Sequence, residues 1–156
     1  MDENAFLEKV FHFDSERGTY RAGAAIVQCF DHRFQLAFSK FFKRAGIANP
    51  DQIQIAGGAK SLASPVSEAA REFLIEQIRT SVRLHDTRRV ILTLHSDCGA
   101  YGGLAEAFGG DAGLEAERQE AELRCAAERL HRALPALEIS AYFAGFDGIW
   151  EVELDR

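Results

Sequence analysis

The chain has 156 residues, 47% hydrophobic and 27% charged, and a formal net charge of −6, which is typical of one globular domain. The acidic balance argues against a general nucleic-acid binder, because phosphate binding requires clustered Lys and Arg. No apolar run reaches the roughly 18–20 residues of a membrane helix, and residues 1–4 lack the pattern of a secretion signal. We therefore expect a single domain over residues 1–156, with residues 1–21 as a candidate N-terminal arm, no membrane partner and a cytoplasmic location.

The first half of the chain alternates predicted strands and helices. Residues 24–30 are almost continuously apolar, which is typical of a buried strand. Residues 34–45 carry apolar side chains at helical spacing, and Gly46 follows where such a helix would end. Residues 51–55 alternate in polarity and predict a second strand, and residues 56–61 form a glycine-containing loop.

A long helix is predicted after this loop. Ser64 and Pro65 are typical of a helix cap and of the first helical position. We expect the helix to run to about Leu84. Its predicted buried side chains are those of Val66, Ala69, Ala70, Phe73, Ile78 and Val82.

Three further strands and one helix complete the predicted fold. Residues 90–94 are the clearest strand of the chain, and residues 114–134 predict a helix that ends before Pro135. Residues 138–143 and 149–154 predict two strands joined by a turn. Because strands that alternate with helices pair in parallel, we expect an α/β fold with a central, mostly parallel sheet flanked by helices.

The residues that could bind a metal or take part in catalysis lie at the ends of two of the predicted strands. Cys29, Asp31 and Arg33 end or follow the first strand, and His95 and Cys98 follow the strand of residues 90–94. The carboxyl ends of parallel strands meet at one edge of an open sheet, so these side chains are expected to converge. Two thiolates and one imidazole suit zinc, and three protein ligands leave room for a reactive water. Asp31 could bind the metal or its water, and Arg33 could hold that carboxylate.

Each of these residues also has a plainer interpretation. Cys29 alone could be a small core side chain, His95 could cap its strand, and Asp31 with Arg33 could form a surface ion pair. The joint pattern of Cys-x-Asp-x-Arg and His-x-x-Cys, both at strand ends, favours a metal site. The loop at residues 57–61 lacks the spacing and the Gly-Lys pair of a phosphate-binding loop.

These two motifs resemble those of the β-class carbonic anhydrases. That family carries Cys-x-Asp-x-Arg after its first core strand and His-x-x-Cys-Gly after a later one, as residues 29–33 and 95–99 do here. The resemblance extends over about residues 22–154. The chain departs from the family in the loop at residues 56–60, in lacking a glutamine just before the first strand, and in a shorter N-terminal arm.

The resemblance implies a set of roles. Cys29, His95 and Cys98 would bind Zn²⁺, and Asp31 and Arg33 would form a dyad that orients a zinc-bound hydroxide. The implied reaction is the reversible hydration of carbon dioxide to bicarbonate, a small-molecule substrate pair. The implied assembly is a homodimer or a higher homo-oligomer.

Three other functions stay open at the level of sequence. Carbonyl sulfide or carbon disulfide could be hydrolysed at the same site, because each is a similarly linear and apolar molecule. A non-catalytic zinc-binding regulator would fit the altered loop and the missing glutamine. Thiol redox chemistry through Cys29 and Cys98 would leave His95 and Asp31 unexplained.

Overall fold

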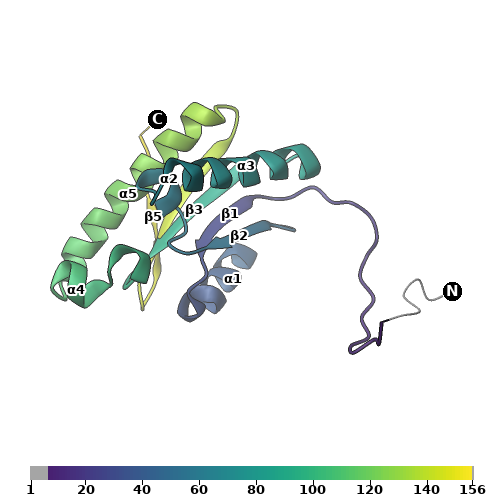
Figure 1. The fold of residues 1–156 in the computed structure, drawn as a ribbon, viewed down its shortest axis with the longest axis horizontal. Coiled ribbons are helices and arrows are strands. Elements are labelled where there is room, and N and C mark those ends of the chain that lie inside the picture. The colour runs from purple at the N-terminus through teal and green to yellow at the C-terminus, as the bar shows by residue number, and fades with distance from the viewer. Residues whose placement is uncertain (1–6, 156) are drawn as a thin grey trace.

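The computed structural model describes residues 7–155 and contains a five-stranded sheet covered by helices on both faces (Figure 1). The strand order is β2-β1-β3-β4-β5; β1 pairs in parallel with β2 and β3, β3 in parallel with β4, and β4 antiparallel with β5. The expected α/β class with a mostly parallel sheet is confirmed. The strands are β1 (Ala25–Cys29), β2 (Asp51–Ile55), β3 (Arg89–His95), β4 (Glu138–Ala144) and β5 (Ile149–Val152).

Helices lie on both faces of the sheet because the central strands are apolar on both sides. Val27 of β1 packs in a cluster with Leu74 of α3 and Leu123 of α5, whereas Ile26 packs with Phe38 of α1 on the opposite face. Figure 1 shows α1 on one side of the sheet and α3 and α5 on the other. The α-helices are α1 (Gln35–Arg44), α2 (Lys60–Ala63), α3 (Glu68–His85), α4 (Leu104–Phe108) and α5 (Ala112–Ala133), and η1 (His32–Phe34) and η2 (Gly99–Tyr101) are short 3₁₀ turns.

The pairing of β1 with β3 determines which side chains meet at the carboxyl edge of the sheet. Val27 lies opposite Leu92 in parallel register, so both strands end at the same edge, with Cys29 on one and His95 on the other. Both strands are almost completely buried. The chemistry-bearing ends of these two strands are thus neighbours.

The predicted helix from Ser64 to Leu84 is wrong at its start and in most of its buried face, although Ile78 is buried as expected. The short α2 begins at the end of the expected loop and runs to Ala63, and α3 begins at Glu68 after Ser67, whose side chain accepts the N–H of Ala70. A different face of α3 is buried from the one expected, because the Arg71 guanidinium is buried and donates to the backbone carbonyls that end α2. The buried side chains of α3 are Arg71, Leu74, Ile75, Ile78 and Ser81, whereas Val66, Ala69 and Phe73 are exposed and Ala70 and Val82 are half-buried.

The N-terminal segment at residues 7–21 contains no helix or strand and extends away from the sheet (Figure 1). Its last part is attached to the body by Tyr20, whose hydroxyl donates to Asp51 at 2.5 Å and whose ring stacks on His85 at 4.0 Å. The candidate arm at residues 1–21 begins with six residues that lie outside the described range, and the single-domain organisation stays a prediction. None of the helices within residues 7–155 has the length and apolar character needed to cross a bilayer.

Candidate metal centre

Three potential metal ligands converge at the carboxyl edge of the sheet. Cys29 ends β1, His95 ends β3, and Cys98 follows in the loop after β3. One ligand atom from each lies within 4.8 Å of the other two, and all three residues are buried. The two sequence motifs therefore meet in space, as their places at the ends of neighbouring strands predict.

The imidazole of His95 has one ring nitrogen in use and the other free. Nδ1 lies 2.7 Å from the carbonyl oxygen of Ser96, and because a carbonyl only accepts, Nδ1 carries the proton. In the neutral ring, which is the form that binds a metal, Nε2 then holds the lone pair. This buried atom has no hydrogen-bond partner within residues 7–155. A neutral imidazole fixed through one nitrogen, with the other unpaired beside two sulfur atoms, matches a metal ligand.

The charges around the three ligands favour a cation. Burial lowers the pKa of His95, but the Cys29 sulfur, the Ser96 carbonyl and the Asp31 carboxylate raise it, and the net shift is upward. These neighbours would stabilise a positive charge on the imidazole, and they would equally stabilise a divalent ion next to it.

The two cysteines have opposite protonation tendencies. The pKa of Cys29 is lowered, chiefly because the Cys98 thiol stabilises the Cys29 thiolate by a hydrogen bond. The pKa of Cys98 is raised by that same hydrogen bond and by burial. One thiolate is thus already favoured, and the second would form as a bound metal displaces the proton of Cys98.

The glycine loop before α2 lies against the Cys29 sulfur. The N–H of Gly57 donates to Sγ of Cys29 at 3.4 Å. A Cβ on Gly58 would lie 2.7 Å from the carbonyl oxygen of Thr93 and 2.9 Å from the nitrogen of Cys29, so only glycine fits there. This loop, in which the sequence differs from the family, therefore forms part of the candidate centre.

Asp31 and Arg33 form a close ion pair beside the ligands. Nη2 of Arg33 donates to Oδ2 of Asp31 at 2.7 Å, and Nε lies 3.1 and 3.2 Å from the two carboxylate oxygens. This pairing is the main reason that the pKa of Asp31 is lowered to about 2. Oδ2 of Asp31 also lies 3.9 Å from Nε2 of His95. The carboxylate is therefore ionised, oriented and adjacent to the free ring nitrogen.

Two acidic residues near the centre were not singled out from the sequence. Asp97 lies between the two ligands of the second motif and contacts Arg33 at 3.0 Å, so its place within the motif was a usable signal. Glu115 lies on α5, is 1% exposed, and accepts hydrogen bonds from the Ser96 hydroxyl and the Asp97 N–H. Nothing in the local sequence of Glu115 indicates this contact, because it depends on how α5 packs against β3.

The donor set fits zinc. Two cysteine sulfurs and one imidazole nitrogen are ligands that Zn²⁺ prefers, and the unpaired Nε2 of His95 would gain a partner from such an ion. A three-ligand centre leaves one position for water or substrate, whereas a four-ligand centre is structural. The neighbouring carboxylate of Asp31 can accept a hydrogen bond from a molecule in that position.

Comparison with known proteins agrees with this fold and centre. The family described as "Putative carbonic anhydrase" matches residues 20–154, so the chain belongs to this family. The resemblance to the β-class carbonic anhydrases is thereby confirmed, with this chain as a divergent member. No curated protein matches the chain.

Solved structures share the architecture at low sequence identity. A carbonic anhydrase from Streptococcus mutans is 20% identical with a TM-score of 0.59, over 91% of this chain and 89% of that one. A carbonic anhydrase from Glaciozyma antarctica is 22% identical with a TM-score of 0.55, over 86% and 84%. A β-carbonic anhydrase from Trichomonas vaginalis is 12% identical with a TM-score of 0.59, over 90% and 87%. These likenesses establish the fold, and the chemistry must be argued from the residues.

Proposed function

We propose that this protein is a zinc-dependent carbonic anhydrase that catalyses the reversible hydration of carbon dioxide to bicarbonate. The observation that carries the proposal is the buried, unpaired Nε2 of His95, which lies beside two cysteine sulfurs and the ionised carboxylate of Asp31. Membership of the carbonic anhydrase family supports the same general reaction.

The proposal assigns separate roles to the residues of the centre. Cys29, His95 and Cys98 would hold Zn²⁺. When bound, this ion acts as a Lewis acid that lowers the pKa of a coordinated water toward neutrality. Asp31 would accept a hydrogen bond from the attacking water, which directs the water's oxygen lone pair at the substrate carbon. Arg33 would keep that carboxylate ionised and oriented.

Aromatic side chains give the centre an apolar wall suited to a linear, non-polar substrate. The ring of Phe34 packs on the His95 ring with centroids 4.5 Å apart, and Phe146 packs on Phe34 at 5.3 Å. Attack joins the water oxygen to the carbon of CO₂, bicarbonate leaves, and one proton passes to solvent. The apolar wall would limit competing water beside the reacting carbon.

Stopped-flow hydration of CO₂ tests the proposal on zinc-loaded protein. We expect wild type to be active and Asp31→Asn to lose roughly 100-fold or more in kcat/KM, because asparagine cannot act as the same charged acceptor. Asp155→Asn, an equal change at an exposed site near the C-terminus, should leave activity unchanged.

Two outcomes would replace the proposal. If zinc-loaded wild type hydrolyses carbonyl sulfide or carbon disulfide but does not hydrate CO₂, the substrate assignment is wrong. If it performs none of these reactions, the protein is a non-catalytic zinc-binding member of the family.

The proposed centre requires two reduced cysteines. Cys29 and Cys98 are free in the structure, and a cytoplasmic environment keeps thiols reduced. This requirement supports the cytoplasm as the location. Fractionation of the producing cells, followed by immunodetection of the protein, tests it.

We also propose that the protein forms a homodimer or a higher homo-oligomer. Several large apolar side chains are exposed, among them Phe11, Phe30, Phe73 and Trp150. Two β-carbonic anhydrases of Sordaria macrospora are tetrameric, and a chain of one of them matches at 16% identity with a TM-score of 0.56. Light scattering coupled to size-exclusion chromatography should give a mass of at least two chains, and a monomer at micromolar concentration would contradict this.

A further inference from the structure

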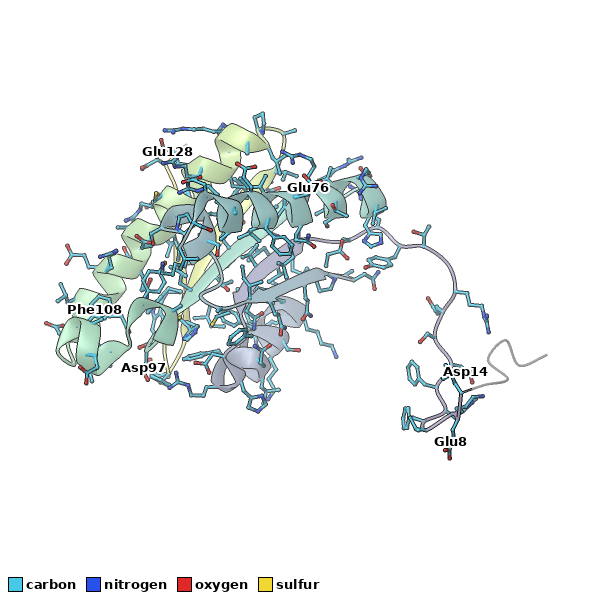
Figure 2. The ribbon with its side chains drawn as sticks, in the orientation of Figure 1. Glu8, Asp14, Glu76, Asp97, Phe108 and Glu128 are labelled. Carbon is cyan, nitrogen blue, oxygen red and sulfur yellow. The ribbon has the colours of Figure 1, made fainter. Side chains whose placement is uncertain are left out.

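Asp97 is an acidic residue beside the candidate centre that contacts both Arg33 and the start of α4, and the proposed reaction does not use it. Figure 2 labels Asp97 where β3 ends, near α4. Its Oδ2 accepts from Nη1 of Arg33 at 3.0 Å, and its carbonyl oxygen accepts from Nη2 of Arg33 at 3.0 Å. Its Oδ1 accepts the N–H of Leu104, the first residue of α4, at 2.8 Å. One residue therefore receives both terminal nitrogens of Arg33 and tethers the start of a helix.

The backbone of Asp97 is held in place from α5. Asp97 has a φ of +55°, in the left-handed region that few residues other than Gly, Asn and Asp adopt. The buried carboxylate of Glu115 accepts the N–H of Asp97 at 2.8 Å and the hydroxyl of Ser96 at 2.5 Å. The position of the Asp97 carboxylate is therefore set by the rigid body of the fold, although its side chain is 38% exposed.

Arg33 needs such a fixed partner. Its side chain is 46% exposed, and its other charged partner, Asp31, lies only two residues away on the same turn. Oδ1 of Asp31 accepts the backbone N–H of Arg33 at 3.0 Å, whereas Oδ2 is held by the Arg33 guanidinium. Oδ2 of Asp31 is 3.9 Å from Nε2 of His95, so a modest rotation would bring the carboxylate to the position that a metal ion would occupy.

We propose that Asp97 is a positioning residue that holds Arg33 turned away from the ligands and thereby keeps Asp31 out of metal coordination. This inference rests on the proposed zinc centre and adds a third carboxylate to the dyad. Without Asp97, the Arg33 guanidinium would lose its fixed partner and would hold Oδ2 of Asp31 less firmly, so that the Asp31 carboxylate would take the fourth position and close the centre to water and substrate.

The test uses cobalt-substituted protein and azide as the probe of an open position. Azide that enters the coordination sphere of Co²⁺ changes its visible absorption spectrum, and this readout is independent of CO₂ turnover. In Asp97→Asn the amide still accepts the N–H of Leu104 but presents an N–H₂ group to Arg33, so only the ion pair is lost. We expect azide affinity to fall roughly tenfold or more, because the attached Asp31 carboxylate competes for the metal.

Three variants complete the design. Asp111→Asn is the matched control, because Asp111 likewise accepts the N–H of a leucine, Leu114, at the start of a helix; it should bind azide as wild type does. Asp97→Gly removes the carboxylate at a φ that glycine adopts freely, so it should fold and also lose azide affinity. Asp97→Asn combined with Asp31→Asn should regain azide binding, because the competing carboxylate is absent.

The outcomes separate this inference from the proposed function. Unchanged azide affinity in both Asp97→Asn and Asp97→Gly overturns the positioning role. A loss of affinity that Asp31→Asn does not restore also overturns it. If wild type binds azide but does not hydrate CO₂, the proposed function fails, and a loss of azide affinity in the Asp97 variants that Asp31→Asn restores still supports the role of Asp97. If wild type takes up no Co²⁺, both proposals are wrong.

Discussion

His95 presents one ring nitrogen to a backbone carbonyl and keeps the other unpaired beside two cysteine sulfurs. At the scale of single residues, this division suits His95 to bind an ion through one nitrogen. A fixed tautomer leaves a single lone pair in a defined direction. The cost of burying that unpaired nitrogen is removed only when a ligand binds it.

Replacing one sulfur ligand should remove the metal. Cys98→Ala leaves two ligands, so we expect elemental analysis of dialysed protein to find about one zinc per wild-type chain and almost none in the variant. Cys125→Ala is the matched control, because Cys125 is a half-buried residue of α5 whose sulfur lies 3.9 Å from the carbonyl oxygen of Ala63. Zinc retained in Cys98→Ala, or lost from Cys125→Ala, would contradict the ligand assignment.

At the scale of elements, the motifs could be predicted because each is short in sequence and follows a strongly apolar strand. The strands at residues 24–30 and 90–94 place Cys29 and His95 correctly, because both lie at the carboxyl ends of parallel neighbours. The helix predicted at residues 64–84 differs from α3 in its start and in most of its buried face, because both depend on the contact of Arg71 with α2. Helices as short as α2 and α4 carry no periodic signal.

The contacts that hold the centre in place depend on tertiary structure and could not be predicted in the same way. Glu115 reaches Ser96 across 19 residues of sequence. The hydrogen bond from Gly57 to the Cys29 sulfur depends on a turn with φ of +78° that places the loop against β1. Sequence patterns indicate the candidate ligands, whereas the contacts that hold them are visible only in the packing of the loops and α5 against the sheet.

The glycine loop gives an element-scale prediction. Gly58→Ala should destabilise the protein by about 3 kcal/mol and weaken zinc binding, because its Cβ would collide with Thr93 and Cys29 at a φ of +54°. Gly109→Ala has a similar φ of +59° with open space around it, so it should cost only about 1 kcal/mol and leave zinc binding unchanged. Urea unfolding and zinc titration measure both effects. Equal effects of the two substitutions would show that the close packing of Gly58 against Thr93 and Cys29 does not matter for the candidate centre.

The contacts of Asp51, at the amino end of β2, give a prediction about stability and pH. Asp51 accepts hydrogen bonds from the hydroxyls of Tyr20 and Ser81 and lies 2.7 Å from Nδ1 of His85. Burial raises the pKa of Asp51, but the three contacts together lower it by more than burial raises it, so the net shift is downward. A carboxyl with a lowered folded pKa contributes stability above its unfolded pKa of about 3.9, and this contribution is lost as the pH falls through the folded value.

Asp51→Asn should therefore reduce the free energy of unfolding by about 2 kcal/mol at pH 7, and the difference from wild type should shrink below about pH 4. Urea unfolding at a series of pH values measures it. Asp14→Asn is the control, because Asp14 lies on the N-terminal segment with its side chain 89% exposed. A difference that stays constant between pH 7 and pH 3 would contradict the role of the Asp51 charge.

At the scale of the whole molecule, the sheet separates two tasks. The carboxyl ends of its strands carry the candidate ligands and lie beside the Asp31–Arg33 ion pair. At the amino end of β2, Asp51 and His85 attach the N-terminal segment through Tyr20. The buried strands β1 and β3 connect these two regions, and apolar side chains of the helices pack on both faces of them. This rigid centre explains how three ligands from two strands and a loop can be held ready for one ion.

The central claim is that these three side chains share one zinc and leave a position open. X-ray absorption spectroscopy at the zinc edge tests it most directly. We predict two sulfur neighbours at about 2.3 Å and two lighter neighbours at about 2.0–2.1 Å, one from His95 and one from solvent, with no change in Asp31→Asn. Fewer than two sulfur neighbours, or a light neighbour that is lost when Asp31 is replaced, would contradict the account.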